Sequence, residues 1–100
     1  MTTLNETEET LKRISNLAGV QGIIIINTDS GLIIRSNFSP EQTNHYVGLI
    51  HSFILKSKAT IRELDVSNEL QFIRIRSKND EILIAPDKDF TMIVIQRPKF

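Results

Sequence analysis

The sequence predicts an α+β sandwich in which a mostly antiparallel, five-stranded sheet is covered by helices. Two segments with helical apolar spacing, residues 3–18 and 39–64, alternate with β-branched segments. Residues 23–26 and 92–95 are apolar without interruption, which is typical of strands covered on both faces. Short polar turns between neighbouring strands favour antiparallel pairing. The predicted order is helix, two strands, helix, three strands, in a single domain of residues 1–100.

Composition excludes several classes of function. Twelve basic residues balance twelve acidic ones, so no overall field attracts nucleic acid or an anionic membrane. Cysteine is absent, which excludes disulfides, thiolate metal sites and cysteine nucleophiles. Residues 1–10 are polar and acidic, unlike a signal or transit peptide. No apolar run approaches the roughly 20 residues of a membrane span, so we expect no membrane insertion.

The first predicted helix, residues 3–18, has a narrow apolar stripe. Thr3 and Glu6 form a candidate capping box, and Gly19 is a natural left-handed stop. The apolar side is formed by Leu4, Leu11, Ile14 and Ala18. A stripe this narrow predicts a helix that lies on a surface.

The second predicted helix, residues 39–64, begins with a clear signal and has a broad apolar stripe. Ser39 can cap it, Pro40 suits the first helical position, and Gln42 completes a capping box. We expect Phe53 within the face that packs on the sheet and Ile54 at its margin. The whole predicted stripe is Tyr46, Leu49, Ile50, Phe53, Ile54, Ile61 and Leu64.

A second stripe on this helix lies roughly opposite the first. It consists of Gly48, Ser52, Leu55 and Ala59, three of which are small. Small residues let another backbone approach closely, so we expect the same helix of a second copy to pack there. The alternative is a solvent face that lacks charge.

The predicted strands are residues 20–27, 32–36, 70–77, 81–85 and 90–96. Arg35 places the second of these near an edge of the sheet. Arg74, Arg76 and Lys78 alternate along the third and form a small basic stripe. With zero net charge and Phe72 as the only aromatic on that side, the stripe does not favour nucleic acid. We expect the arginines to cover the end of the sheet or to pair with acidic groups, and they are also suited to protect an edge strand.

The sequence contains no recognisable catalytic motif. His45 and His51 are six residues apart and point to different sides of their helix, so they cannot share a metal by local spacing. Asp87 and Asp89 flank a lysine in a predicted turn. Phosphate-loop and nucleophile-elbow motifs are absent. We therefore predict a protein that is not an enzyme and has no catalytic residue, cofactor or metal.

Several segments, in the same order, resemble the roadblock-type dynein light chain family. The resemblance runs from about residue 8 to residue 96. Two regions depart from the family pattern: NFSPE at 37–41 and RPKF at 97–100. The matching segments are EETLKRI (8–14), GVQGIIIIN (19–27), HSFILK (51–56), FIRIRSK (72–78), APDKDF (85–90) and IVIQ (93–96).

The resemblance implies a homodimer in which two long helices lie antiparallel and two sheets join through the segment at 70–77. It implies a light chain that binds the dynein intermediate chain, and through it the dynein heavy chain and microtubules. The implied location is the cytoplasm and cytoskeleton, with the axoneme of a cilium or flagellum as an alternative. Related domains instead scaffold or regulate small GTPases. The implied dimer interface is Gly48, Ser52, Leu55, Ala59, Phe72, Arg74 and Arg76.

Overall fold

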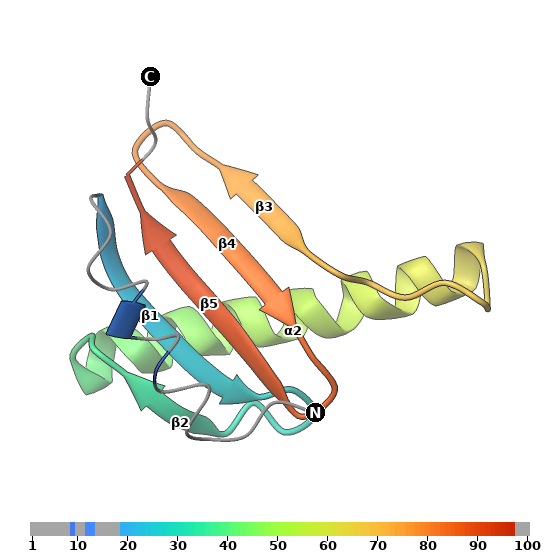
Figure 1. Cartoon of the computed structure of the whole chain (residues 1–100), viewed down its shortest axis with the longest axis horizontal. Coiled ribbons are helices and arrows are strands. Elements are labelled where there is room, and N and C mark those ends of the chain that lie inside the picture. Colours follow the sequence, from blue (N-terminus) through green and yellow to red (C-terminus); the bar gives the residue numbers. More distant parts are fainter. Residues whose placement is uncertain (1–8, 10–11, 14–18, 98–100) are drawn as a thin grey trace.

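The computed structural model describes residues 9, 12–13 and 19–97. Its elements are β1 (Val20–Asn27), β2 (Ile33–Ser36), α2 (Pro40–Leu64), β3 (Ile73–Arg76), β4 (Glu81–Pro86) and β5 (Phe90–Gln96). The five strands form one sheet in the order β2-β1-β5-β4-β3, and every neighbouring pair is antiparallel (Figure 1). The predicted α+β class and the order of the described elements are confirmed.

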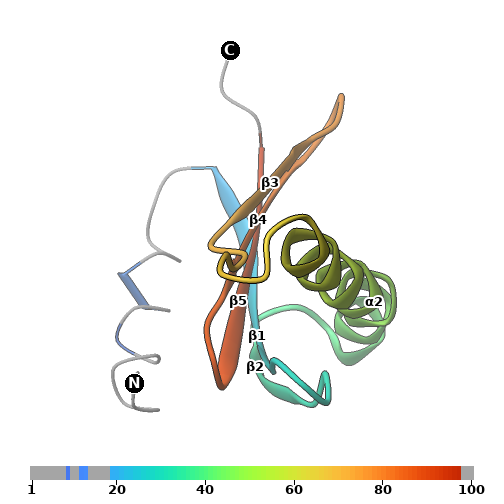
Figure 2. The ribbon, with the colours of Figure 1, turned by 90° about the vertical axis from the view of Figure 1, so that its right-hand side faces the viewer.

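Most of the first predicted helix lies outside the described residues. Glu9, Lys12 and Arg13 are helical and exposed. They lie on the side of the sheet away from α2 (Figure 2).

Both faces of the central strands are buried. Ile24 and Ile26 of β1 belong to the core cluster beneath α2. Ile23 and Ile25 point to the opposite face and are also 0% exposed. An uninterrupted β-branched run therefore marks a strand covered on both sides, as predicted.

Helix α2 begins as predicted, with one difference in the cap. Ser39 is extended and its hydroxyl oxygen accepts a hydrogen bond from the backbone N–H of Gln42 at 3.2 Å, with Pro40 in the first turn. In a full capping box the Gln42 side chain accepts from the backbone N–H of the cap residue. Here the Ser39 hydroxyl donates to Gln42 Oε1 at 3.2 Å instead.

The face of α2 that meets the sheet differs from the predicted stripe. Its buried residues are Thr43, Val47, Ile50 and Ile54. Leu49 is 65% exposed and Phe53 45% exposed, whereas Ile54 is 0% exposed. The prediction that Phe53 is central and Ile54 marginal was wrong, and the terminal Leu64 is also exposed.

Thr43 explains why the spacing of apolar residues predicted the wrong buried face for α2. Its hydroxyl hydrogen-bonds with the Ser36 hydroxyl at 2.7 Å and donates to the Ser39 carbonyl at 2.8 Å. A polar side chain with its bonds satisfied can be buried at little cost. It therefore occupies the core face without contributing to an apolar pattern.

Two glycines allow close approach between α2, its leading segment and the sheet. A Cβ at Gly22 overlaps the ring of Phe38, which packs 5.2 Å from the Tyr46 ring, centroid to centroid. Gly31 has φ +77°, and a Cβ there lies 2.8 Å from Nδ1 of His51. The Nε2 atom of His51 lies 3.1 Å from the Thr28 carbonyl oxygen. These contacts hold the β1–β2 turn against α2.

The strand bounds predicted from the sequence agree with the observed ones for some strands and differ for others. β1 and β5 have the predicted bounds, and β4 extends one residue further. β3 is shorter than the predicted 70–77, because only residues 73–76 pair with β4. Leu70 and Phe72 belong instead to the connection that leads from α2 into the sheet. β2 begins at Ile33, one residue later than predicted.

Candidate interaction surfaces

The outward face of α2 carries the second stripe. Gly48, Ser52, Leu55 and Ala59 are all exposed, Leu55 to 42%. A glycine inside a helix costs about 0.5–1 kcal/mol relative to alanine. A Cβ at Gly48 meets no atom within 4 Å. Within one copy, nothing in the described part of the chain therefore requires glycine at this position.

The C-terminal part of α2 extends past the sheet on the side of β3 (Figure 1). Leu64 is 78% exposed there, and Val66 just beyond the helix is 81% exposed. With Leu49 and Phe53, these residues give α2 an apolar surface that its own sheet does not cover.

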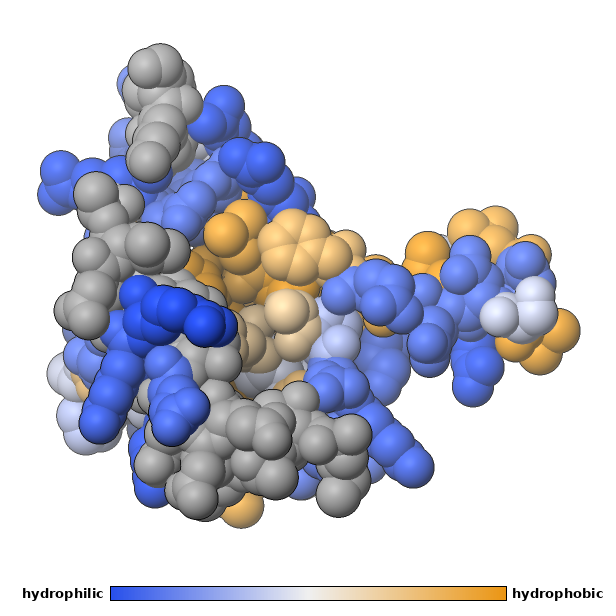
Figure 3. All heavy atoms as spheres, viewed as in Figure 1, coloured by the Kyte–Doolittle hydropathy of each residue, from blue (hydrophilic) through white to orange (hydrophobic). Residues whose placement is uncertain are grey.

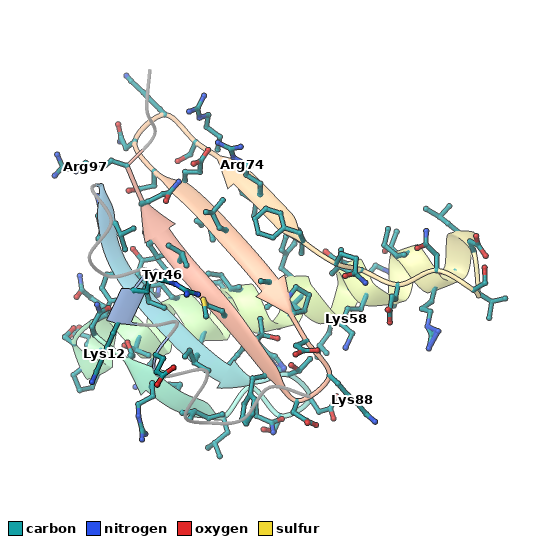
Figure 4. The ribbon with its side chains drawn as sticks, in the orientation of Figure 1. Lys12, Tyr46, Lys58, Arg74, Lys88 and Arg97 are labelled. Carbon is teal, nitrogen blue, oxygen red and sulfur yellow. The ribbon has the colours of Figure 1, made fainter. Side chains whose placement is uncertain are left out.

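β3 is a free edge strand that carries two arginines on the sheet face away from α2. Ile73 and Ile75 pack toward the core cluster, so Arg74 and Arg76 alternate onto the outward face. The arginine side chains are 60% and 47% exposed. Figure 4 shows Arg74 and Arg97 at one end of the sheet and Lys88 at the other.

A buried carboxylate holds these arginines. Glu81 is 1% exposed, and its Oε2 lies 2.8 Å from Nε of Arg74 and 3.4 Å from Nε of Arg76. Gln96 Nε2 donates to Oε1 at 2.6 Å. The hydrogen bonds from Arg74 and Gln96 lower the pKa of Glu81, against a smaller opposing effect of burial. Of the predicted alternatives, pairing with an acidic group is confirmed, and β3 is an edge strand.

Below this cluster the outward sheet face is apolar. Leu83 and Met92 are half-buried and Ala85 is exposed, and all three alternate away from α2. Phe72, one residue before β3, is 53% exposed. Figure 3 shows an apolar area over β3 and β4, bordered by hydrophilic residues. In the sequence, the consecutive apolar residues of β4 indicated that both faces of this strand are apolar.

The structure shows the environments of the remaining candidate residues from the sequence. His51 supports the β1–β2 turn, and His45 is exposed. Asp87 Oδ1 accepts from the backbone N–H of Lys88, and the Asp89 carbonyl accepts from the N–H of Thr28. Within residues 9, 12–13 and 19–97, no three His, Asp or Glu side chains are placed to hold a metal ion. Among the same residues, no helix is long and apolar enough to cross a membrane.

Two of the hollows in the described part of the chain lie at the rim of the sheet. A cavity of about 620 Å³ lies between α2, its following connection and the β4–β5 turn. Its charged lining is balanced, with Asp29, Glu69 and Asp87 against Lys58, Arg62 and Lys88. A cavity of about 270 Å³ lies between β2 and the start of α2. In the described part of the chain, no buried polar side-chain atom lacks a hydrogen-bond partner. Neither hollow therefore shows a polar group reserved for a ligand.

An antiparallel five-stranded sheet, with one long helix across a face and a free β3 edge, defines an α+β domain whose open surfaces suit association with other chains. The model of the Roadblock/LC7 domain family matches residues 6–97, and the chain belongs to this family.

Solved structures share the fold at low sequence identity. A Roadblock/LC7 domain from Streptomyces avermitilis has a TM-score of 0.75 at 8% identity, over 84% of this chain and 71% of that one. Myxococcus xanthus MglB has a TM-score of 0.74 at 13% identity, over 96% and 79%. The gliding protein MglB from Thermus thermophilus has a TM-score of 0.76 at 10% identity, over 97% and 76%. At these identities the likeness establishes the fold alone.

Proposed function

We propose that the chain is a non-catalytic, self-associating subunit that holds a segment of a larger protein. The observation that carries this proposal is the outward face of α2, where no atom of the described part of a single copy lies within 4 Å of a Cβ at Gly48. A close helix–helix contact accounts for a residue that otherwise only weakens its helix. A further MglB structure is described as having a tetrameric arrangement, which supports self-association in this fold.

The proposed assembly is a two-fold dimer through α2 and β3. Helix α2 has 25 residues, about 37 Å at the usual rise, and its C-terminal part projects past the sheet. An antiparallel second copy covers this projection and the exposed Leu55 and Phe53. Pairing of the two β3 edges joins the sheets and removes the free edge. The interface then comprises the seven residues implied by the family resemblance, together with the apolar flank of α2.

The proposed partner is a dynein intermediate chain, with the heavy chain and microtubules reached through it. This rests on the sequence segments shared with roadblock-type dynein light chains, above all those at 72–78 and 85–90. The proposed location follows the partner: cytoplasm and cytoskeleton, or the axoneme. An amphipathic segment laid on the joined sheets is the expected mode of binding. Dimerisation is required, because each copy supplies half of the surface.

The second candidate is a scaffold or regulator of a small GTPase. The bacterial structural neighbours favour this candidate over a dynein light chain. The sheet topology is compatible with both, and no exposed arginine of the described chain is singled out for a role beside a bound nucleotide.

The test is capture of the native partner by the tagged chain. We expect an intermediate-chain polypeptide to co-purify with the parent, and its fragments to bind in a calorimetric titration. Capture of a small GTPase in place of an intermediate chain supports the second candidate. Gly48→Glu should lose both dimer and partner, since burying an unpaired charge costs roughly 3–5 kcal/mol. Ser30→Glu, at an exposed position in the β1–β2 turn and outside the proposed interface, is the matched control. Binding by a proven monomer contradicts the proposal.

A further inference from the structure

The β3 edge poses an electrostatic problem for the proposed dimer. Arg74 and Arg76 lie two residues apart on the outward face of the strand that must pair with its own copy. A two-fold axis perpendicular to the sheet places outward residues opposite outward residues. Arg74 and Arg76 of one copy therefore face Phe72, Arg74 or Arg76 of the other. Like charges directly opposite each other on paired strands are destabilising.

Glu81 is placed to relieve this repulsion. It lies directly opposite Arg76 on the neighbouring strand, and Arg74 reaches it diagonally from its position opposite Leu83. One carboxylate, 1% exposed, thus contacts both guanidinium groups. Gln96 on β5, opposite Glu81 on the other side, fixes the second carboxylate oxygen. The contacts draw the arginine heads inward over β4, away from the edge.

We propose that Glu81 determines whether two β3 edges can pair, because it holds both arginines back over their own sheet and supplies a negative charge beside them. This inference rests on the proposed assembly through β3. Glu81 acts through the arginines and is a positioning residue. Its role makes self-association depend on a group that lies one strand away from the edge.

A purely structural role predicts a different pattern of effects. If Glu81 only clamps β3 to β4 and β5, its loss lowers the stability of each copy and changes association only through unfolding. If Glu81 also balances the charge of the arginines at the β3 edge, its loss adds one net positive charge per copy beside the two-fold axis. The dimer is then weakened even when each copy is folded, and salt restores it by screening the repulsion.

The experiment measures the dimer dissociation constant of Glu81→Gln by sedimentation equilibrium at low and high salt. Glutamine preserves the size and one oxygen acceptor but removes the charge. We expect association about tenfold weaker or more at low salt, equivalent to about 1.4 kcal/mol, with much of the loss recovered in high salt. Adding Arg76→Gln to Glu81→Gln should restore association, because it removes the charge left in excess.

Asp29→Asn is the matched control. It removes the same charge from an exposed position in the β1–β2 turn, outside α2 and β3. Its dimer should match that of the parent. Thermal melts and circular dichroism show whether each variant is folded. If Glu81→Gln does not fold, Arg76→Gln alone serves: we expect a dimer at least as tight as the parent and less sensitive to salt.

The outcomes separate this inference from the assembly on which it rests. A monomeric parent overturns the proposed dimer, and the role of Glu81 with it. A dimeric parent whose folded Glu81→Gln variant associates equally well overturns the role of Glu81 alone. A dimer weakened by Arg76→Gln also contradicts the inference, because it shows that the arginine contributes attraction at the edge.

Discussion

Replacing Ile54 by alanine tests which face of α2 meets the sheet. Ile54 is 0% exposed and belongs to the core cluster with Ile50, Ile84 and Ile93. Truncation of a fully buried isoleucine costs about 2–5 kcal/mol, from lost transfer energy and from the cavity left behind. A domain of this size has only about 5–15 kcal/mol of stability. Each kcal/mol lowers the melting temperature by about 4–8 °C.

Phe53→Ala is the matched comparison on the neighbouring position. Phe53 is 45% exposed, so its truncation removes about half of the usual 1.5–3 kcal/mol for a buried side chain, roughly 0.8–1.5 kcal/mol. The assay is chemical and thermal unfolding of both variants in the Gly48→Glu background, because the proposed dimer covers Phe53 and association raises apparent stability. Ile54→Asp should unfold the chain outright, and Phe53→Asp should not. Equal costs for the two alanine variants refute this orientation of α2.

Two further predictions concern the β1–β2 turn and the acid range. Gly31→Ala should destabilise the fold by about 1–3 kcal/mol, because φ is +77° and the new Cβ contacts His51; an unchanged urea midpoint contradicts this. The pKa of Glu81 is lowered by Arg74 and Gln96, so its contribution is complete above the unfolded value of about 4.3. That contribution is lost as the pH falls through the folded pKa. Stability of Glu81→Gln should therefore decline less steeply below about pH 4 than that of the parent, and identical pH profiles contradict the assignment.

The sheet was largely predictable because its strands carry strong local signals. The isoleucine run of β1 and the apolar run of β5 bury both faces, so their bounds follow from composition alone. The start of α2 was predictable from Ser39 and Pro40 for the same local reason. The extent of β3 was not predictable, because Leu70 and Phe72 have the residue pattern of a strand but lie in the connection before β3.

The orientation of α2 and the environment of Glu81 depend on tertiary contacts. Thr43 is buried because Ser36 and the Ser39 carbonyl satisfy its hydroxyl, which no apolar pattern records. Glu81 directly follows a polar hairpin and resembles a solvent-exposed residue in the sequence. Its burial follows from lying opposite Arg76 on one side and Gln96 on the other. An alternation of Arg, Arg and Glu across a predicted hairpin was the available signal.

The absence of cysteine makes the central claim, two-fold packing of α2 on its own copy, directly measurable. Ser52 lies close to the midpoint of the stripe from Gly48 to Ala59, so two copies of it are offset along antiparallel helices by only about 5 Å. Asn44 near the helix start is separated from its own copy by about 28 Å along the same axes. The decisive measurement is crosslinking of Ser52→Cys and Asn44→Cys by a short bis-maleimide at micromolar concentration. The account predicts a covalent dimer for Ser52→Cys and none for Asn44→Cys. Absence of the first product, or equal yields of the two, contradicts it.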